Sequence, residues 1–165
     1  MKTIRKILIP AIACLPLAAA ANLVCPGFSS QTTPQHDIFV SPYTHHWRHS
    51  HEHNRVALVG VKRQLPDYRL CGFSVFSNSF GQPSAYGFTG WHWPTIFDSD
   101  RLYATVTAGI LYGYVGPYKN KVPLNFNGFS PAVVPAFGLR LTPQLSTEVH
   151  ILGTAGLMFG INSHF

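Results

Sequence analysis

Apolar and polar residues alternate with a period of two along several short segments of this chain. The clearest segment runs from Arg101 to Tyr114, where every second side chain from Leu102 onward is apolar or aromatic and those between are smaller or more polar. The segment from Gln144 to Leu152 repeats the pattern, with Glu148 on its polar face. Such alternation predicts β-strands with one apolar face.

Eight segments of this kind follow one another, with Gly, Pro, Asn or Asp turn signals between most of them. The chain ends in Phe165, and a terminal aromatic residue after an alternating segment is typical of outer-membrane barrels. We therefore predict an all-β fold, an eight-stranded antiparallel transmembrane β-barrel. The strands are expected at residues 36–47, 55–64, 68–80, 84–93, 101–114, 129–141, 144–152 and 157–165.

The composition supports a barrel in lipid. Apolar residues make up 46% of the chain and charged residues only 11%, whereas a soluble domain carries about 25% charged residues. A carboxylate that faces lipid is costly, so Glu148 is expected to point into the lumen. Three tryptophans fall at strand ends, where aromatic girdles lie: Trp47, Trp91 and Trp93.

The N-terminal residues resemble an export signal. Basic residues precede an apolar stretch from Ile7 to Leu17, and the alanines from Ala18 to Ala21 offer cleavage sites. The apolar stretch is too short to span a bilayer as a helix. We expect a signal peptide at residues 1–21, a short periplasmic leader at 22–35 and the barrel at 36–165, in the cell outer membrane.

Charge and cysteine content narrow the expected partners. Without the signal, nine Lys and Arg face six acidic residues, which gives a net charge of about +3. Such mild and scattered charge argues against nucleic-acid binding, and we expect a monomer. Cys25 and Cys71 remain in an oxidising compartment, so two alternatives stay open: a disulfide or two free thiols.

Three prolines lie within the predicted strands, and proline cannot donate to a β-ladder. Pro42, Pro131 and Pro135 therefore leave gaps in the hydrogen-bonded wall. One interpretation is a bulge near a rim. The other is a lateral opening through which a lipid chain enters from the membrane. The sequence favours neither.

The topology brings a histidine and a serine to one rim. Odd-numbered strands run outward when both termini are periplasmic, so the ends of the first and third strands share the outer rim. These ends carry His46 and Ser79, and the two strands are separated by one neighbour, about 10 Å along the wall. A histidine beside a serine can act as a general base or activate a nucleophile.

The order of several motifs resembles that of the lipid A palmitoyltransferase (PagP) family. Asp37-Ile38-Phe39-Val40 followed by His46 resembles the start of the first strand of that family, and Phe76-Ser77-Asn78-Ser79-Phe80 resembles its Phe-Lys-Asp-Ser-Phe. Residues 86–91, Thr107-Ala108-Gly109, the spacing of three prolines (Pro131, Pro135 and Pro143) and Gly153-Thr154 add to the likeness. The family moves an acyl chain from a phospholipid to lipid A in the outer membrane.

This resemblance implies roles for five residues. His46, Asn78 and Ser79 fall on catalytic positions, Gly90 on the glycine at the floor of the hydrocarbon pocket, and Pro135 among the prolines beside the lateral opening. Asn78 replaces an aspartate of the family, so it would orient rather than ionise. A change of Asn78 to Asp is accordingly expected to raise activity. The implied partners are a phospholipid donor and a lipid A acceptor, with no cofactor and no metal.

Two further functions remain as alternatives. A small barrel that lost the catalytic acid would bind lipid without catalysis, whereas a pore is disfavoured because eight strands leave little free lumen. The histidines near the first outer loop are either solvated residues that face lipid phosphate or ligands of zinc or copper. They are His45, His46, His49, His51 and His53.

Overall fold

The computed structural model describes Cys25 and residues 35–165. The predicted signal peptide, residues 1–21, therefore lies outside the described residues, as does the predicted leader except Cys25 and Gln35. The described part contains a short 3-10 helix, η1 (Gly116–Lys121), and eight strands. These are β1 (Gln35–His46), β2 (Ala57–Gln64), β3 (Arg69–Ser77), β4 (Pro83–Trp93), β5 (Leu102–Tyr112), β6 (Phe129–Thr142), β7 (Leu145–Ile151) and β8 (Gly156–His164).

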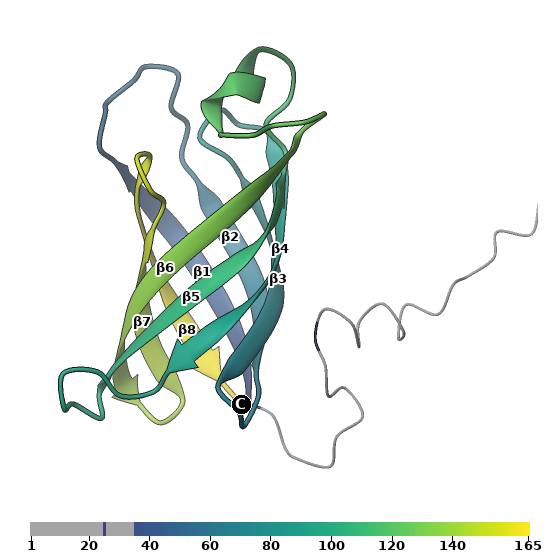
Figure 1. Cartoon of the computed structure of the whole chain (residues 1–165). Coiled ribbons are helices and arrows are strands. Elements are labelled where there is room, and N and C mark those ends of the chain that lie inside the picture. Colours follow the sequence, from purple (N-terminus) through teal and green to yellow (C-terminus); the bar gives the residue numbers. More distant parts are fainter. Residues whose placement is uncertain (1–24, 26–34) are drawn as a thin grey trace, which may run out of the picture.

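The eight strands form one closed barrel in which each strand is antiparallel to the next (Figure 1). β8 pairs with β1, and the backbone of Phe165 exchanges two hydrogen bonds with His36, at 3.0 and 2.9 Å. The predicted all-β antiparallel barrel is confirmed. The predicted strand bounds differ from the observed ones by at most three residues, the largest difference being at the end of β3.

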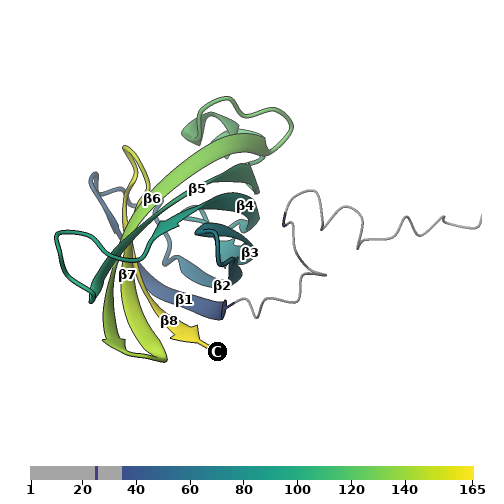
Figure 2. The same cartoon turned by 60° about the horizontal axis from the view of Figure 1, so that its bottom comes forward.

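The two ends of the barrel differ in their connections (Figure 2). At the end that holds the C-terminus, residues 65–68 and 143–144 make short turns, and residues 94–101 make a loop between β4 and β5. At the opposite end, residues 47–56 and 113–128 make longer loops, and the second of these contains η1. We call the end that holds the C-terminus the inner rim and the opposite end the outer rim, after the orientation expected from the sequence.

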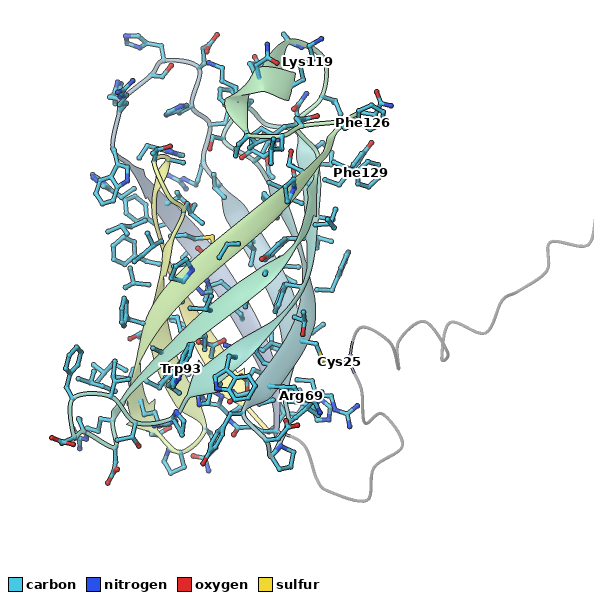
Figure 3. All side chains as sticks on the ribbon, viewed as in Figure 1. Cys25, Arg69, Trp93, Lys119, Phe126 and Phe129 are labelled. Atoms are coloured by element: carbon cyan, nitrogen blue, oxygen red, sulfur yellow. A yellow bond between two sulfur atoms is a disulfide. The ribbon has the colours of Figure 1, made fainter. Side chains whose placement is uncertain are left out.

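Period-two alternation sorts the side chains between lipid and lumen. Figure 3 shows them along the wall, with Trp93 and Arg69 near the inner rim and Lys119 and Phe126 at the outer rim. Glu148 is buried in the lumen, as predicted. None of the described helices is long and apolar enough to cross a bilayer. The outward belt is aliphatic and aromatic: Ile38, Val40, Val59, Phe73, Val75, Ile110, Val133, Phe137, Phe159 and Ile161.

A bulge near Pro42 changes the face on which β1 residues lie. The pairing of β1 with β8 shifts between Val40 and Tyr43. Below the shift the odd-numbered residues of β1, such as Phe39, are buried, whereas above it the even-numbered Thr44 and His46 turn inward and line the cavity. Of the two interpretations of Pro42, the structure therefore shows the bulge.

Polar side chains fill the lumen near the inner rim. Lys62 lies 2.7 Å from Glu148 and 3.7 Å from Asp37, and all three are buried. His164 contacts both Asp37, at 2.7 Å, and Ser146, at 2.8 Å. We call this group of hydrogen-bonded residues, which are buried or partly buried, the polar plug: Asp37, Lys62, Gln64, Tyr103, Ser146, Glu148, His150, Asn162 and His164.

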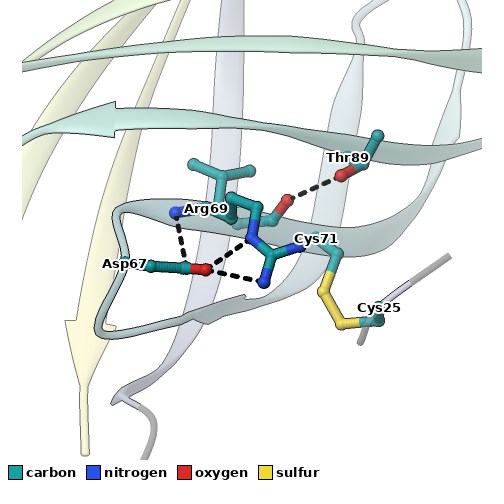
Figure 4. The surroundings of a disulfide bond; sticks show 6 residues. Cys25, Asp67, Arg69, Cys71 and Thr89 are labelled. Atoms are coloured by element: carbon teal, nitrogen blue, oxygen red, sulfur yellow. Dashed lines mark hydrogen bonds and ion pairs between the residues drawn. A yellow bond between two sulfur atoms is a disulfide. The ribbon is translucent and has the colours of Figure 1, made fainter. Parts of the chain in front are cut away.

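A disulfide joins Cys25 to Cys71 on the outside of β3 (Figure 4), with their Cα atoms 5.5 Å apart. Of the two alternatives left open by the sequence, the structure therefore shows the bond. Nearby, Arg69 donates to Asp67 at 2.6 Å, and this hydrogen bond holds the pKa of Asp67 below its ordinary value. The disulfide ties the chain before β1 to β3, across 46 residues of sequence.

Loss of this disulfide is expected to destabilise the barrel. Closing a loop of 46 residues stabilises the folded state by about 4 kcal/mol in the chain-entropy description. The double change Cys25→Ser and Cys71→Ser should therefore lower the denaturant midpoint of unfolding. Reduction with a phosphine should shift the wild-type midpoint equally and leave the double variant unchanged. Equal midpoints for oxidised and reduced wild type would contradict this expectation.

Candidate functional site

A cavity of about 350 Å³ occupies the outer half of the lumen. Its volume falls in the range of small-molecule sites, about 300–1,000 Å³. His46, Asn78 and Ser79 line its mouth at the outer rim, while Thr105 and two members of the polar plug, Lys62 and Glu148, line its floor. The walls between them are mostly apolar and include Phe39, Leu58, Phe76, Phe88, Leu111 and Met158.

Two reactive side chains meet at the mouth of this cavity. The Nε2 atom of His46 lies 3.2 Å from the Oγ atom of Ser79. The expected meeting of the two side chains at the outer rim is thus confirmed. Next to His46, the backbone N–H of Trp47 donates to the carbonyl of Ala155 at 3.2 Å, which ties the end of β1 to the turn before β8.

Different local features aim these two side chains into the lumen. The bulge at Pro42 turns His46 inward, and the hydroxyl of Ser41 holds the bulge by donating to the carbonyl of Phe159 at 2.7 Å. Ser79 lies in the turn between β3 and β4, and its carbonyl accepts from the backbone N–H of Asn54 at 2.7 Å. Both positions therefore depend on local backbone geometry.

Asn78 supports this turn with both ends of its amide. Its Nδ2 atom donates to Ser84 Oγ at 3.1 Å and to the carbonyl of Gly113 at 3.2 Å. Its Oδ1 atom accepts from the backbone N–H groups of Phe80, at 2.9 Å, and Gln82, at 3.1 Å. Since Gly113 offers only an acceptor and the two N–H groups are donors, the amide orientation is fixed. Among the described contacts, no hydrogen bond joins Asn78 to His46.

Aromatic and charged residues surround the mouth. The rings of His46 and His53 lie 4.3 Å apart, and Phe80 stacks on Tyr118 at 4.3 Å. Lys121 lies 5.2 Å above the Phe80 ring and 3.6 Å from Glu52. Burial raises the pKa of Tyr114, which also lines the cavity, so its phenol stays protonated at neutral pH. The described part of the chain holds no group of three or more His, Cys, Asp or Glu residues arranged for a metal ion.

The barrel wall is incompletely paired beside the cavity. Among the described residues, β6 pairs with β7 only from Ala136 toward the inner rim, although β6 begins at Phe129. Likewise, β1 pairs with β2 only as far as Ser41, although β1 continues to His46. The outer parts of both strands therefore keep one paired neighbour each, β5 for β6 and β8 for β1.

Pro131 and Pro135 lie in or beside the unpaired edge of β6. The N–H of Arg140 donates to the carbonyl of Arg101, directly before β5, so even-numbered residues of β6 point their N–H groups toward β5. Odd-numbered residues, including both prolines, face the side of β7. Their missing donors therefore cost no hydrogen bond to β5, and the pairing of β5 with β6 continues through both without a shift.

Two residues singled out by the resemblance do not line the cavity. Gly90 is on the lumen face of β4, but a Cβ atom there would clash with the carbonyl oxygen of Val106 and would lie 2.9 Å from the Cα atom of Thr107. Its bare backbone therefore allows β4 and β5 to approach closely. Pro135 faces outward on β6, whereas Pro131 lines the cavity.

Sequence reasoning missed several residues of this site. Thr44 lines the cavity two residues before His46, and its hydroxyl is buried without a hydrogen-bond partner. Its inward direction depends on the bulge, which the sequence left open. Lys62 and Thr105 at the floor carried a weak signal, since each is a polar residue on the lumen face of an alternating strand.

Comparison with known proteins supports the fold alone. No family model matches the chain, and no curated protein matches it. Among solved structures, a chain from "De novo design of transmembrane beta-barrels" has 15% identical residues and a TM-score of 0.58, over 80% of this chain and 95% of that chain. At this identity the likeness concerns the closed barrel and carries no function.

Proposed function

We propose that the protein is an outer-membrane acyltransferase that moves a fatty acyl chain from a phospholipid to lipid A. The observation that carries the proposal is the contact of 3.2 Å between His46 and Ser79 at the mouth of an apolar cavity. An alkyl chain fits the apolar walls, and its ester then lies at the rim beside the histidine. The export signal and the motif order add support for the outer membrane and for these substrates.

The unpaired strand edges support a lateral route for the donor. A phospholipid in the outer leaflet can pass its chain between β6 and β7, or between β1 and β2, without breaking ladder hydrogen bonds. Pro131 and Pro135 keep the edge of β6 poor in donors, so another strand cannot readily pair with it. Of the two interpretations of these prolines, this proposal adopts the lateral opening.

In the proposed reaction, His46 acts as the general base. It takes the proton from a sugar hydroxyl of the acceptor, and the resulting oxygen attacks the carbonyl carbon of the phospholipid ester. The ester C–O bond breaks, and the lysophospholipid oxygen leaves with the proton that His46 carried. In this mechanism the hydroxyls of Ser79 and Thr44 stabilise the oxyanion, and Asn78 holds the turn that bears Ser79; the contact of Ser79 with His46 and the unpartnered hydroxyl of Thr44 support these roles.

The alternative is a barrel that binds lipid without catalysis. One observation favours it: among the described residues, no carboxylate contacts His46, and Glu52 at the same rim pairs with Lys121 at 3.6 Å. An imidazolium that forms during the reaction would then lack the charged partner that often stabilises it.

Mass spectrometry of lipid A decides between these two functions. Lipid A from cells that express the protein should carry an additional acyl chain, which is absent from cells that lack it or that express His46→Ala at equal levels in the outer membrane. The exposed neighbour His45→Ala serves as a control that keeps the modification. Identical lipid A from all four strains would favour the non-catalytic barrel.

A further inference from the structure

The floor of the cavity is charged, although the walls above it are apolar. Lys62 from β2 and Glu148 from β7 both line the floor, and their side chains are 7% and 0% exposed. The ammonium of Lys62 donates to Glu148 at 2.7 Å and also faces Asp37 at 3.7 Å. An alkyl chain that descends the cavity therefore ends against a buried ion pair.

Lys62 and Glu148 belong to the polar plug, and its other members hold this floor from below. Glu148 also accepts from the hydroxyl of Tyr103 at 3.0 Å and contacts His150 at 2.9 Å. The hydroxyl of Tyr103 is also hydrogen-bonded to Ser146, at 2.7 Å, and Ser146 in turn contacts His164 at the inner rim. An alkyl chain that extended beyond the floor would separate buried charges from their partners. This costs far more free energy than keeping the last methylene groups beside the apolar walls.

Gly90 does not form the floor of the cavity. It is absent from the cavity lining, and its missing side chain serves the close approach of β4 to the backbone at Val106. Substitution of Gly90 would disturb the pairing of β4 with β5 before it altered the depth of the cavity.

We propose that the Lys62–Glu148 pair sets the greatest length of alkyl chain that the cavity accepts. The inference rests on the proposed function in one respect, that an alkyl chain occupies the cavity, and it adds which residues select that chain. The affinity for an alkyl chain should rise with chain length while the chain fills the cavity. It should then fall abruptly, because a longer chain would have to break the buried ion pair.

Native mass spectrometry of the full chain tests this, with saturated fatty acids of increasing length as probes. The double change Lys62→Ala and Glu148→Ala removes both charges together, and Asp37 keeps Gln64 at 2.6 Å and His164 at 2.7 Å. It should move the limit to longer chains, with about a tenfold gain in retention of the first chain beyond the wild-type limit. Thr105→Met, which adds bulk at the floor, should move the limit to shorter chains. The lipid-facing change Val75→Leu should leave it unchanged.

Separate outcomes overturn separate claims. A wild-type limit that stays in place in the double variant and in Thr105→Met, when both migrate as folded barrels on gels, overturns the role of the pair. If the double variant does not fold, the shift in Thr105→Met decides. A wild-type barrel that retains no fatty acid of any length overturns both this inference and the proposed acyl-chain site.

Discussion

Replacement of His46 by alanine is expected to lower the rate of acyl transfer by about 10²–10⁴-fold, the usual contribution of a positioned general base. The barrel should still fold, because His46 ends β1 at the rim, is only partly buried and carries little packing. The rate is measured with purified protein in mixed micelles, as transfer of a labelled acyl chain from phospholipid to lipid A. Heat-modifiable gel migration checks the fold.

Matched variants separate the chemistry from general disturbance of the rim. His45 precedes His46 but lies exposed on the outer face, so His45→Ala should retain the wild-type rate. Ser79→Ala removes the hydroxyl that lies 3.2 Å from His46 and should also lower the rate, by about 10²–10³-fold. Full activity in His46→Ala would refute the proposed base. If wild type and variants transfer nothing under any condition, the barrel is a lipid-binding protein.

The sequence could predict the barrel because alternation with a period of two survives in nearly every strand. It could not predict the phase of that alternation through a bulge. Strict alternation from Asp37 places His45 in the lumen and His46 against lipid, whereas the shift before Tyr43 reverses the two. The resemblance identified His46, and only the bulge explains how it reaches the cavity.

The polar plug could not be predicted for a different reason. Its members come from strands far apart in sequence, and their meeting depends on the stagger that accumulates around a closed barrel. Lys62 and Glu148 are 86 residues apart in sequence, yet their charges pair at 2.7 Å. Alternation indicated that Glu148 faces the lumen, but it could not identify Lys62 as its partner. The expectation that Gly90 forms the floor of the cavity could therefore be replaced only once the strand register was known.

Asn78→Asp is expected to destabilise the turn between β3 and β4 and to reduce activity, opposite to the expectation from the sequence alone. That expectation assumed a carboxylate beside His46. In the structure, Asn78 is 1% exposed, and its Nδ2 atom donates to Ser84 Oγ and to the carbonyl of Gly113 at 3.2 Å. An aspartate would set a buried anionic oxygen against that carbonyl, which costs roughly 3 kcal/mol.

The charge of the new carboxylate makes this prediction testable by pH. A buried carboxylate opposite a carbonyl has a raised pKa, so its penalty is present above that pKa and is relieved as the pH falls and the acid becomes neutral. The unfolding midpoint of Asn78→Asp should therefore lie below that of wild type at neutral pH and approach it in mild acid. Gln82→Glu adds the same charge in the same turn and sets it against the carbonyl of Val115, but at a solvent-exposed hydrogen bond, so it should lower the midpoint much less. If Asn78→Asp were more active than wild type with an unchanged midpoint, the carboxylate would have turned toward His46, and the expectation from the sequence would be correct.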